Sequence, residues 1–164
     1  MASTGERVLE PRTAYAEVML NDLIQLFRRD LAKLTAELEA YPTDAALWTV
    51  KGEIKNPAGN LALHLNGNLN QYIGVRLGGT SYLRNREAEF RLKGVPRAEL
   101  IAATQATSSM IETVLGGLDP ARLGQPYPEE VLGYPMTTGY FLIHVHGHLN
   151  WHLGQINYHR RLTA

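Results

Sequence analysis

Apolar residues recur every three or four positions over four stretches of the chain, which is the spacing of helices that bury one face. The first stretch runs from about Pro11 to Ala40, with charged residues between its leucines. The second begins after Asn56 and Pro57, which offer a cap side chain and a proline for the first helical position. It ends at Gly78-Gly79, so a helix of about 21 residues is predicted between these signals.

Two further helices follow in the second half of the chain. Val95-Pro96 opens the third pattern, which stops at Gly116-Gly117. After a loop rich in proline and glycine, Thr137 or Thr138 can cap a last helix that runs to about Leu162. No segment has the alternation typical of a strand.

Four long amphipathic helices in one chain predict an all-α fold, a four-helix bundle, formed as a single domain over residues 1–164. The three connections have about 15 to 19 residues each, so each is long enough to cross the bundle and length leaves the topology open. The connector around residues 79–95 contains YLRNREAEF, whose charges and aromatic residues suit a segment that caps the bundle or lines a pocket.

The amino-acid composition argues against several classes of function and of metal ligand. Lys plus Arg equals Asp plus Glu at 16 each, so the excess positive charge that drives nucleic-acid binding is missing and no nucleic-acid partner is expected. The chain has no cysteine, so a metal would be held by nitrogen and oxygen ligands only. The N-terminal segment carries charges where a secretory signal needs apolar residues, and no apolar run approaches the ~20 residues of a membrane span. We therefore expect a cytoplasmic protein with no membrane association.

The last helix places two histidines on one face. His148 and His152 are four residues apart, which puts them about 40° apart in rotation and about 6 Å apart along the axis. They share their face with apolar residues and point toward the interior, as does His64 of the second helix. Three inward histidines from two helices can form a facial metal triad; the alternative is a set of core histidines bonded to neighbours or to water.

Other polar residues near these histidines have open roles. His144 can carry protons at a pocket mouth or be a solvated histidine at the core edge. Asn68 and Gln155 can orient a bound water or substrate, or satisfy hydrogen bonds between helices. His146 and His159 are interpreted as surface or interface residues.

The connector carries a charged set that can pin the loop or clasp an anionic substrate, although a solvated set of ion pairs is favoured: Arg84, Arg86, Glu87 and Glu89. Three aromatic residues are interpreted as packing residues rather than substrate platforms: Tyr72, Trp151 and Tyr158.

The pairing of LALHLNGNL in the second helix with HLNWHLGQI in the last resembles the DinB and YfiT-like family of four-helix-bundle metalloproteins. The stretch QYIGVRLGGTSYLRNREAEF resembles one branch of that superfamily whose activity is not established. The resemblance covers essentially the whole chain. It implies that His64, His148 and His152 are the metal ligands, that the bundle runs up-down-down-up with a crossover between the second and third helices, and that the protein forms a homodimer. Characterised relatives include bacillithiol-dependent S-transferases and mycothiol-dependent maleylpyruvate isomerase.

Three neutral nitrogen ligands leave a divalent ion its full charge and open positions, an arrangement that suits catalysis on a small molecule. Ni²⁺ or Zn²⁺ fits best, and Fe²⁺, Mn²⁺ and Co²⁺ are also accepted by nitrogen ligands. One option is a thiol S-transferase, in which the metal activates a low-molecular-weight thiol as a thiolate. The second is a hydrolase with an acidified water. The thiol option is preferred, because the second helix offers no carboxylate near His64 as a general base. A non-catalytic metal-binding or stress-response protein is the third option, and a bundle whose histidines only pack is the fourth.

Overall fold

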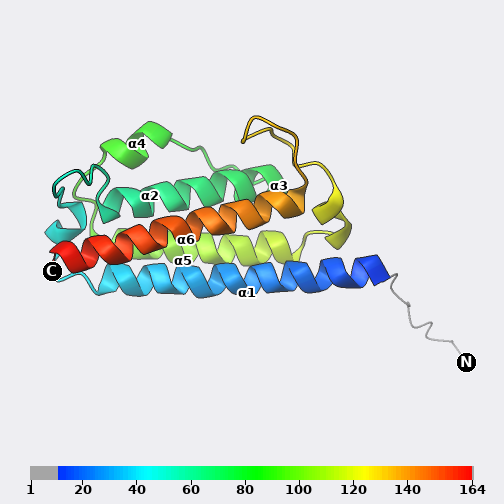
Figure 1. Cartoon of the computed structure of the whole chain (residues 1–164), viewed down its shortest axis with the longest axis horizontal. Helices are drawn as coiled ribbons and strands as arrows, with labels where there is room; N and C mark the ends of the chain where they lie inside the picture. The colour runs from blue at the N-terminus through cyan, green and yellow to red at the C-terminus, as the bar shows by residue number, and fades with distance from the viewer. Residues whose placement is uncertain (1–10, 164) are drawn as a thin grey trace, which may run out of the picture.

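The computed structural model describes residues 11–163, in which four long helices lie side by side (Figure 1). The prediction that concerned the N-terminal segment therefore falls largely on residues 1–10, outside the described part of the chain. The long helices are α1 (Pro11–Glu39), α2 (Ala58–Leu69), α5 (Arg97–Gly116) and α6 (Thr138–Thr163). The predicted all-α bundle is confirmed, and the described residues contain no strand, only two isolated bridges.

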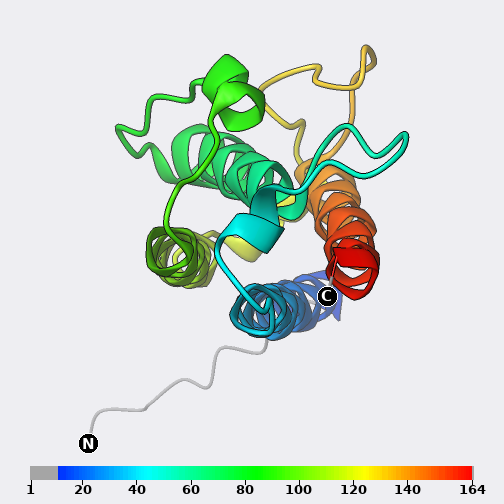
Figure 2. The ribbon, with the colours of Figure 1, turned by 90° about the vertical axis from the view of Figure 1, so that its left-hand side faces the viewer.

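The helices run up-down-down-up, as the family resemblance implies. In Figure 1, α1 and α6 run in one direction and α2 and α5 in the other. Viewed from one end, α1 packs against α5 and α6, and α2 packs against the same two helices, so α1 and α2 lie on a diagonal (Figure 2). As a result α2 and α6 are antiparallel neighbours along their length.

The core lies between the four apolar faces that the periodicity predicted. On α1 the fully buried side chains are spaced by three and four residues: Phe27, Leu31, Leu34 and Leu38. Leu61, Leu65 and Leu69 of α2 and Leu142, Leu149 and Ile156 of α6 close the core from the other side. Burying side chains of this size contributes about 1.5–3 kcal/mol each, which fixes the rotation of α2 and α6 and hence the direction of their polar residues.

The start and stop signals in the sequence hold at most helix ends. Thr137 Oγ1 accepts a hydrogen bond from Tyr140 N at 3.2 Å and so caps α6. Gly79 ends the second helical stretch with φ +65°, a left-handed conformation that glycine adopts without strain. The predicted cap at Asn56 is wrong: α2 begins at Ala58, extended Pro57 occupies the cap position, and no side chain there accepts a capping hydrogen bond.

The second helical stretch is not uniform. After α2, the chain widens into π-helical turns over Asn70–Val75 and then tightens again in α3 (Arg76–Gly78). The Asn70 amide donates to Asn66 O and to Thr107 Oγ1, both at 2.9 Å, and so ties this segment to α5. Such π-helical turns are rare and frequent near functional sites, and here they follow His64 by less than two turns.

Only one connection crosses the bundle. Residues 79–96 lead from the end of α3 back to the start of α5 and contain the short helix α4 (Arg86–Arg91), which packs against α2. Asn85 caps α4, because its side chain accepts from Ala88 N at 3.0 Å. The other two connections stay at the bundle ends and contain single 3₁₀ turns at Ala45–Trp48 and Pro120–Gly124. None of the described helices combines the length and the apolar character that a membrane span requires.

Candidate metal centre

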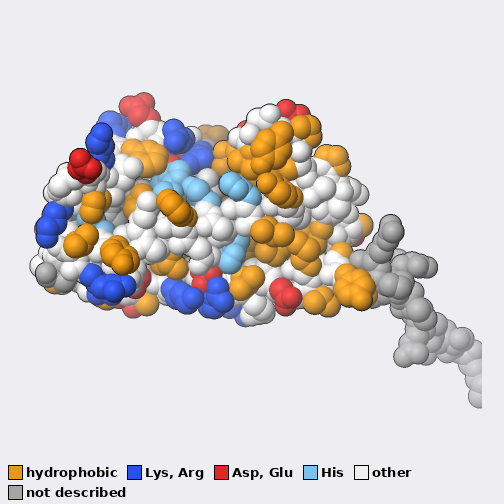
Figure 3. All heavy atoms as spheres, in the orientation of Figure 1, with side chains coloured by type: hydrophobic (Ala, Val, Ile, Leu, Met, Phe, Trp, Pro, Cys, Tyr) orange, Lys and Arg blue, Asp and Glu red, His pale blue; other side chains and the backbone are white. Residues whose placement is uncertain are grey.

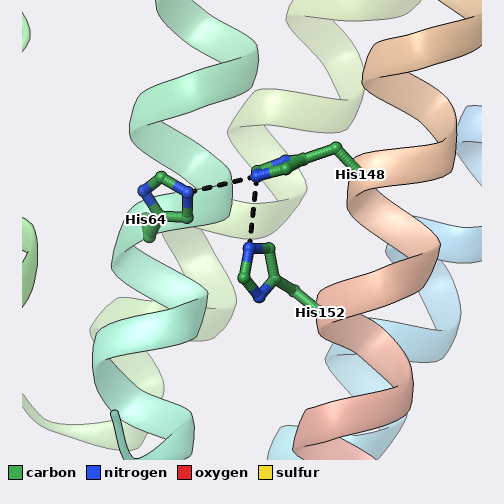
Figure 4. Close-up of side chains that lie close together, drawn as sticks. All are labelled: His64, His148 and His152. Carbon is green, nitrogen blue, oxygen red and sulfur yellow. Dashed lines mark hydrogen bonds between the residues drawn. The ribbon is translucent and has the colours of Figure 1, made fainter.

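The three predicted histidines meet between α2 and α6 (Figure 4). His148 Nε2 lies 3.3 Å from His64 Nε2 and 3.2 Å from His152 Nε2. One ring nitrogen from each residue lies within 4.8 Å of the other two. The planes of the rings are steep to one another, at 72°, 86° and 82° for the three pairs. The side chains therefore point their nitrogen edges at a common position.

The bundle produces this meeting from two local patterns. His148 and His152 are one turn apart on α6, on a face that also buries Val145 and Leu149. His64 lies on the buried face of α2, which is the antiparallel neighbour of α6. Hydrophobic packing of the two helices thus sets the distance across which the imidazoles face one another.

Two of the three imidazoles are oriented by an outer hydrogen bond. His64 Nδ1 donates to Glu89 Oε2 at 2.9 Å, and His152 Nδ1 donates to Gln155 Oε1 at 2.6 Å. Arg84 Nη2 also lies 3.4 Å from His64 Nδ1, but the shorter contact to a carboxylate places the proton on His64. With the Nδ1 atoms protonated, the Nε2 atoms of both rings carry lone pairs, and both lone pairs face His148.

Glu89 is the residue that sequence reasoning missed at this site. It lies on α4 with 6% of its side chain exposed, and Arg84 grips it with Nε on Oε1 at 2.7 Å and Nη2 on Oε2 at 2.9 Å. Burial alone would raise the pKa of the Glu89 carboxyl, but hydrogen bonds from His64 and Arg84 outweigh burial and hold that pKa below its usual value. The interpretation of Arg84 and Glu89 as solvated ion-pair residues is therefore wrong. It fits Glu87, which is 85% exposed.

Gly67 makes the approach of Glu89 to α2 feasible. A Cβ at this position would overlap the Glu89 carboxylate, only 2.8 Å from its Cδ. Gly67 stands three residues after His64 on the same side of the helix, so the missing side chain leaves room for the carboxylate beside the imidazole. A glycine in the middle of a predicted helix was the available signal for such a close approach.

His148 differs from the other two ligand candidates. Burial and the neighbouring His152 and His64 lower the pKa of His148 to about 4, so this imidazole is neutral near pH 7. Its Nδ1 is buried and has no hydrogen-bond partner within residues 11–163. The pKa of His152 is also lowered, by burial and by His64, although the bond with Gln155 acts in the opposite direction. Neutral imidazoles are the form that binds metals.

The nitrogen spacing fits a metal ion. Two nitrogens bound to a tetrahedral Zn²⁺ at about 2.0–2.1 Å are roughly 3.3 Å apart. The two separations around His148 Nε2, which Figure 4 marks as hydrogen bonds, match this value. The donor set consists of three imidazole nitrogens, so the three histidines can hold a divalent ion.

Two pockets open beside the triad. The smaller, of about 220 Å³, is lined by His64 and His148 together with Arg84 and Arg86. The larger, of about 460 Å³, is lined by His152 and Gln155 and by residues of the loop before α2, including Glu53 and Lys55. The triad therefore has accessible space on two sides, rather than being sealed by packed hydrocarbon.

Comparison with protein-family models identifies the family of this bundle. The family model of the DinB superfamily matches residues 23–156, which span all three histidines. The chain belongs to the DinB superfamily. Neither the curated proteins nor the solved structures contain a match to this DinB superfamily chain.

The remaining predicted site residues of this DinB superfamily chain fall at the edges of the triad. Gln155 bonds to His152, as described above. Asn68 lines the smaller pocket, and its buried Oδ1 has no hydrogen-bond partner in the described part of the chain. His144 is exposed at the same pocket and stacks on Phe141, with ring centroids 5.9 Å apart. The structure thus brings all three beside the triad, and only Gln155 touches a ligand candidate.

The other two histidines of the DinB superfamily chain serve the fold. His159 was interpreted as a surface or interface residue, which is wrong: it is 2% exposed, with Nδ1 2.7 Å from Tyr41 Oη and Nε2 donating to Thr49 O at 2.8 Å. His146 is partly buried and bonds to the fully buried Asp30 of α1 at 2.9 Å.

Two aromatic residues interpreted as packing residues are in fact exposed. Trp151 is 70% and Tyr158 68% exposed on the outer face of α6, so their interpretation as packing residues is wrong, and Tyr158 also lines the larger pocket. Tyr72, by contrast, packs edge-on against Phe141 as expected.

Proposed function

We propose that this DinB superfamily chain is a divalent-metal-dependent enzyme, with His64, His148 and His152 as the protein ligands. The observation that carries the proposal is the convergence of three ring nitrogens at the spacing of metal ligands, two of them with their lone pairs fixed by outer hydrogen bonds. Ni²⁺ and Zn²⁺ are the favoured ions, and Fe²⁺, Mn²⁺ or Co²⁺ would find the same donors.

The reaction we propose is S-transfer from a low-molecular-weight thiol. A bound divalent ion would supply Lewis acidity that stabilises the thiolate at neutral pH. The thiol loses its proton to solvent, its sulfur forms a bond to an electrophilic carbon, and the leaving group departs with the electron pair of the broken bond. Two organic reactants are needed, and the presence of two pockets on different sides of the triad supports a transferase.

The protein side chains have separate tasks in this proposal. Glu89 holds the His64 imidazole in one tautomer and one orientation, and Gln155 does the same for His152. Glu89 is itself bound by Arg84, so it is not free to act as a general base for water. Because the Glu89 carboxylate is already bound by Arg84, we favour S-transfer over hydrolysis.

Metal titration tests the site first. Untagged protein is expected to bind about one Zn²⁺ or Ni²⁺ per chain, and His148→Ala is expected to abolish this binding. His144→Ala is the matched control, because His144 lies one turn away on the same helix and lines the smaller pocket without touching the triad. Unchanged stoichiometry in His148→Ala would overturn the ligand assignment.

The metal-loaded protein is then assayed with a thiol and an electrophile whose conjugate absorbs light. Product that requires bacillithiol, mycothiol or another thiol, and that His148→Ala no longer forms, supports S-transfer. Ester or amide hydrolysis without thiol would establish the hydrolase instead. A metal-dependent rise in melting temperature with no product from either panel would indicate a non-catalytic metal-binding protein.

We also propose the homodimer that the family resemblance implies. Four large side chains are exposed at helical spacing on the outer face of α6: Tyr140, Ile143, Trp151 and Tyr158. Between Thr138 and His159 this helix contains no Asp, Glu, Lys or Arg, and depletion of charge is typical of interface cores. Sedimentation over a range of concentrations is expected to show a dimer that Trp151→Glu dissociates. A wild-type monomer at all concentrations would contradict the proposal.

A further inference from the structure

The smaller pocket beside the triad has an unusual charge pattern. It is lined by His64 and His148 of the triad and by Arg84 and Arg86 of the crossover connection. Among the described residues, no Asp or Glu side chain lines this pocket. Figure 3 shows histidine side chains at the molecular surface with basic side chains directly beside them. The pocket therefore presents positive charge next to the imidazoles.

The two arginines are not equally free. Arg84 uses Nε and Nη2 for Glu89, while its Nη1 donates to no described residue. Arg86 forms no ion pair within residues 11–163, and its guanidinium lies 5.5 Å from the centre of the Phe90 ring. Two positive charges and one negative charge leave this group of side chains with a formal charge of plus one.

Both guanidinium groups are held in place by aromatic rings. Arg84 lies over Tyr72, with 5.7 Å between its Cζ and the ring centre. The Phe90 ring, which contacts the Arg86 guanidinium, also packs against the His64 ring, with 5.0 Å between the two ring centres. Contacts of this kind favour guanidinium positions beside the rings, and so keep positive charge near the triad.

We propose that this pocket binds the carboxylate of a small monoanionic organic acid, with Arg86 and Nη1 of Arg84 as its charge partners. Asn68 lines the same pocket and adds a neutral polar side chain to its wall. In the metal-free protein a monoanion balances the formal charge of plus one, whereas dianionic phosphate leaves excess negative charge in a partly buried space. The volume of about 220 Å³ suits a molecule of a few carbon atoms.

The assignment deepens the proposed function, because it names one substrate class of the same site. The carboxylate anchors the electrophilic substrate on the His64 and His148 side of the triad, and the larger pocket on the His152 side remains for the thiol. Anion binding itself does not require the metal, so the two proposals can fail separately.

Propionate and its neutral analogue propionamide are the probes for this pocket. Metal-free, full-length protein is titrated with each compound while backbone amide shifts are followed by NMR. Propionate is expected to give saturable shifts at residues that line the pocket, and propionamide is not. Arg86→Gln is expected to weaken propionate binding roughly tenfold. Arg91→Gln, in the same short helix but 67% exposed and outside the pocket, is expected to bind as the wild type does.

Three results would overturn the assignment: no saturable shifts, equal binding of propionamide, or equal affinity in Arg86→Gln and wild type. Tighter binding of inorganic phosphate than of propionate at the same pH would overturn the carboxylate class. Zn²⁺ stoichiometry is measured on separate aliquots of the same preparation after the metal is added. Uptake of one ion per chain without propionate binding refutes the pocket alone. Propionate binding by protein that takes up no added Zn²⁺ refutes the proposed function alone.

Discussion

Replacing Glu89 by Gln is expected to damage both stability and metal affinity. The carboxylate is 6% exposed and accepts three N–H groups, one from His64 and two from Arg84. Glutamine keeps the size and one acceptor oxygen, but its NH₂ group must then face another N–H donor. Removing one partner of a buried ion pair costs about 3–5 kcal/mol. The retained oxygen puts our expectation at the lower end, about 3 kcal/mol.

The effect of this substitution on metal binding is separate. In place of the carboxylate, glutamine offers His64 only a neutral amide group, which fixes its tautomer less firmly and raises its basicity less. Loss of such an outer partner typically weakens metal affinity 10–100-fold, or about 1.4–2.8 kcal/mol. Urea unfolding of the metal-free protein gives the first quantity, and titration of Zn²⁺ against a coloured chelator gives the second.

Glu87→Gln is the matched control, since it makes the same chemical change two residues away. Glu87 is 85% exposed and its contact with Arg91 is long, at 3.7 Å, so its replacement is expected to change stability by less than about 0.5 kcal/mol. If Glu89→Gln and Glu87→Gln unfold at the same urea concentration and bind Zn²⁺ equally, the role assigned to Glu89 is refuted.

The pH dependence gives a further check on Glu89. Because its pKa is lowered in the folded protein, its contribution is present above the unfolded value of about 4.3 and is lost as pH falls through the folded value. The stability difference between wild type and Glu89→Gln should therefore shrink below about pH 5. A difference that stays constant down to pH 3 would contradict the ion-pair origin of the effect.

Three other expectations follow from the site and its surroundings. The pKa of about 4 for His148 predicts that metal-free protein loses at most about 3 kcal/mol as pH falls from about 6.5 to 4, because only the unfolded chain takes up that proton; a flat profile in urea unfolding would contradict this. Gly67→Ala should lower Zn²⁺ affinity by displacing the buried carboxylate, whereas Gly147→Ala, with open space at its Cβ, should leave it unchanged; equal affinities in the titration would refute the close approach. Asp30→Asn should destabilise the bundle by about 3 kcal/mol without changing metal stoichiometry, since its partners lie outside the triad; calorimetry with elemental analysis tests both halves, and lost metal would be the contrary result.

The bundle and the triad could be predicted because their signals are local. Proline and glycine mark the helix ends, and the four-residue spacing of His148 and His152 defines one face without knowledge of the rest of the fold. His64 follows from the apolar face of its own helix. The three rings share one position only because α2 and α6 are antiparallel neighbours. Hydrophobic periodicity does not predict this pairing, whereas the family resemblance implied it.

The partners of the triad could not be predicted in this way. Glu89 reaches His64 only because the crossover connection folds back over α2, and nothing in its spacing from His64 encodes that path. The same holds for His159, which is buried by contact with Tyr41 and Thr49 of a distant segment. Charged residues in a connector are usually solvated. That expectation failed for Arg84 and Glu89, because this pair is buried against the bundle.

The metal ligands and the residues around them come from different parts of the chain. The bundle helices supply the three imidazoles, while the crossover connection supplies the carboxylate behind His64 and both arginines of the pocket wall. Grafting another loop between α3 and α5 would thus be expected to retune ligand basicity and substrate choice together, leaving the imidazole cage untouched. Diversification of such a scaffold can proceed by exchange of one surface segment, at little risk to the hydrophobic interior.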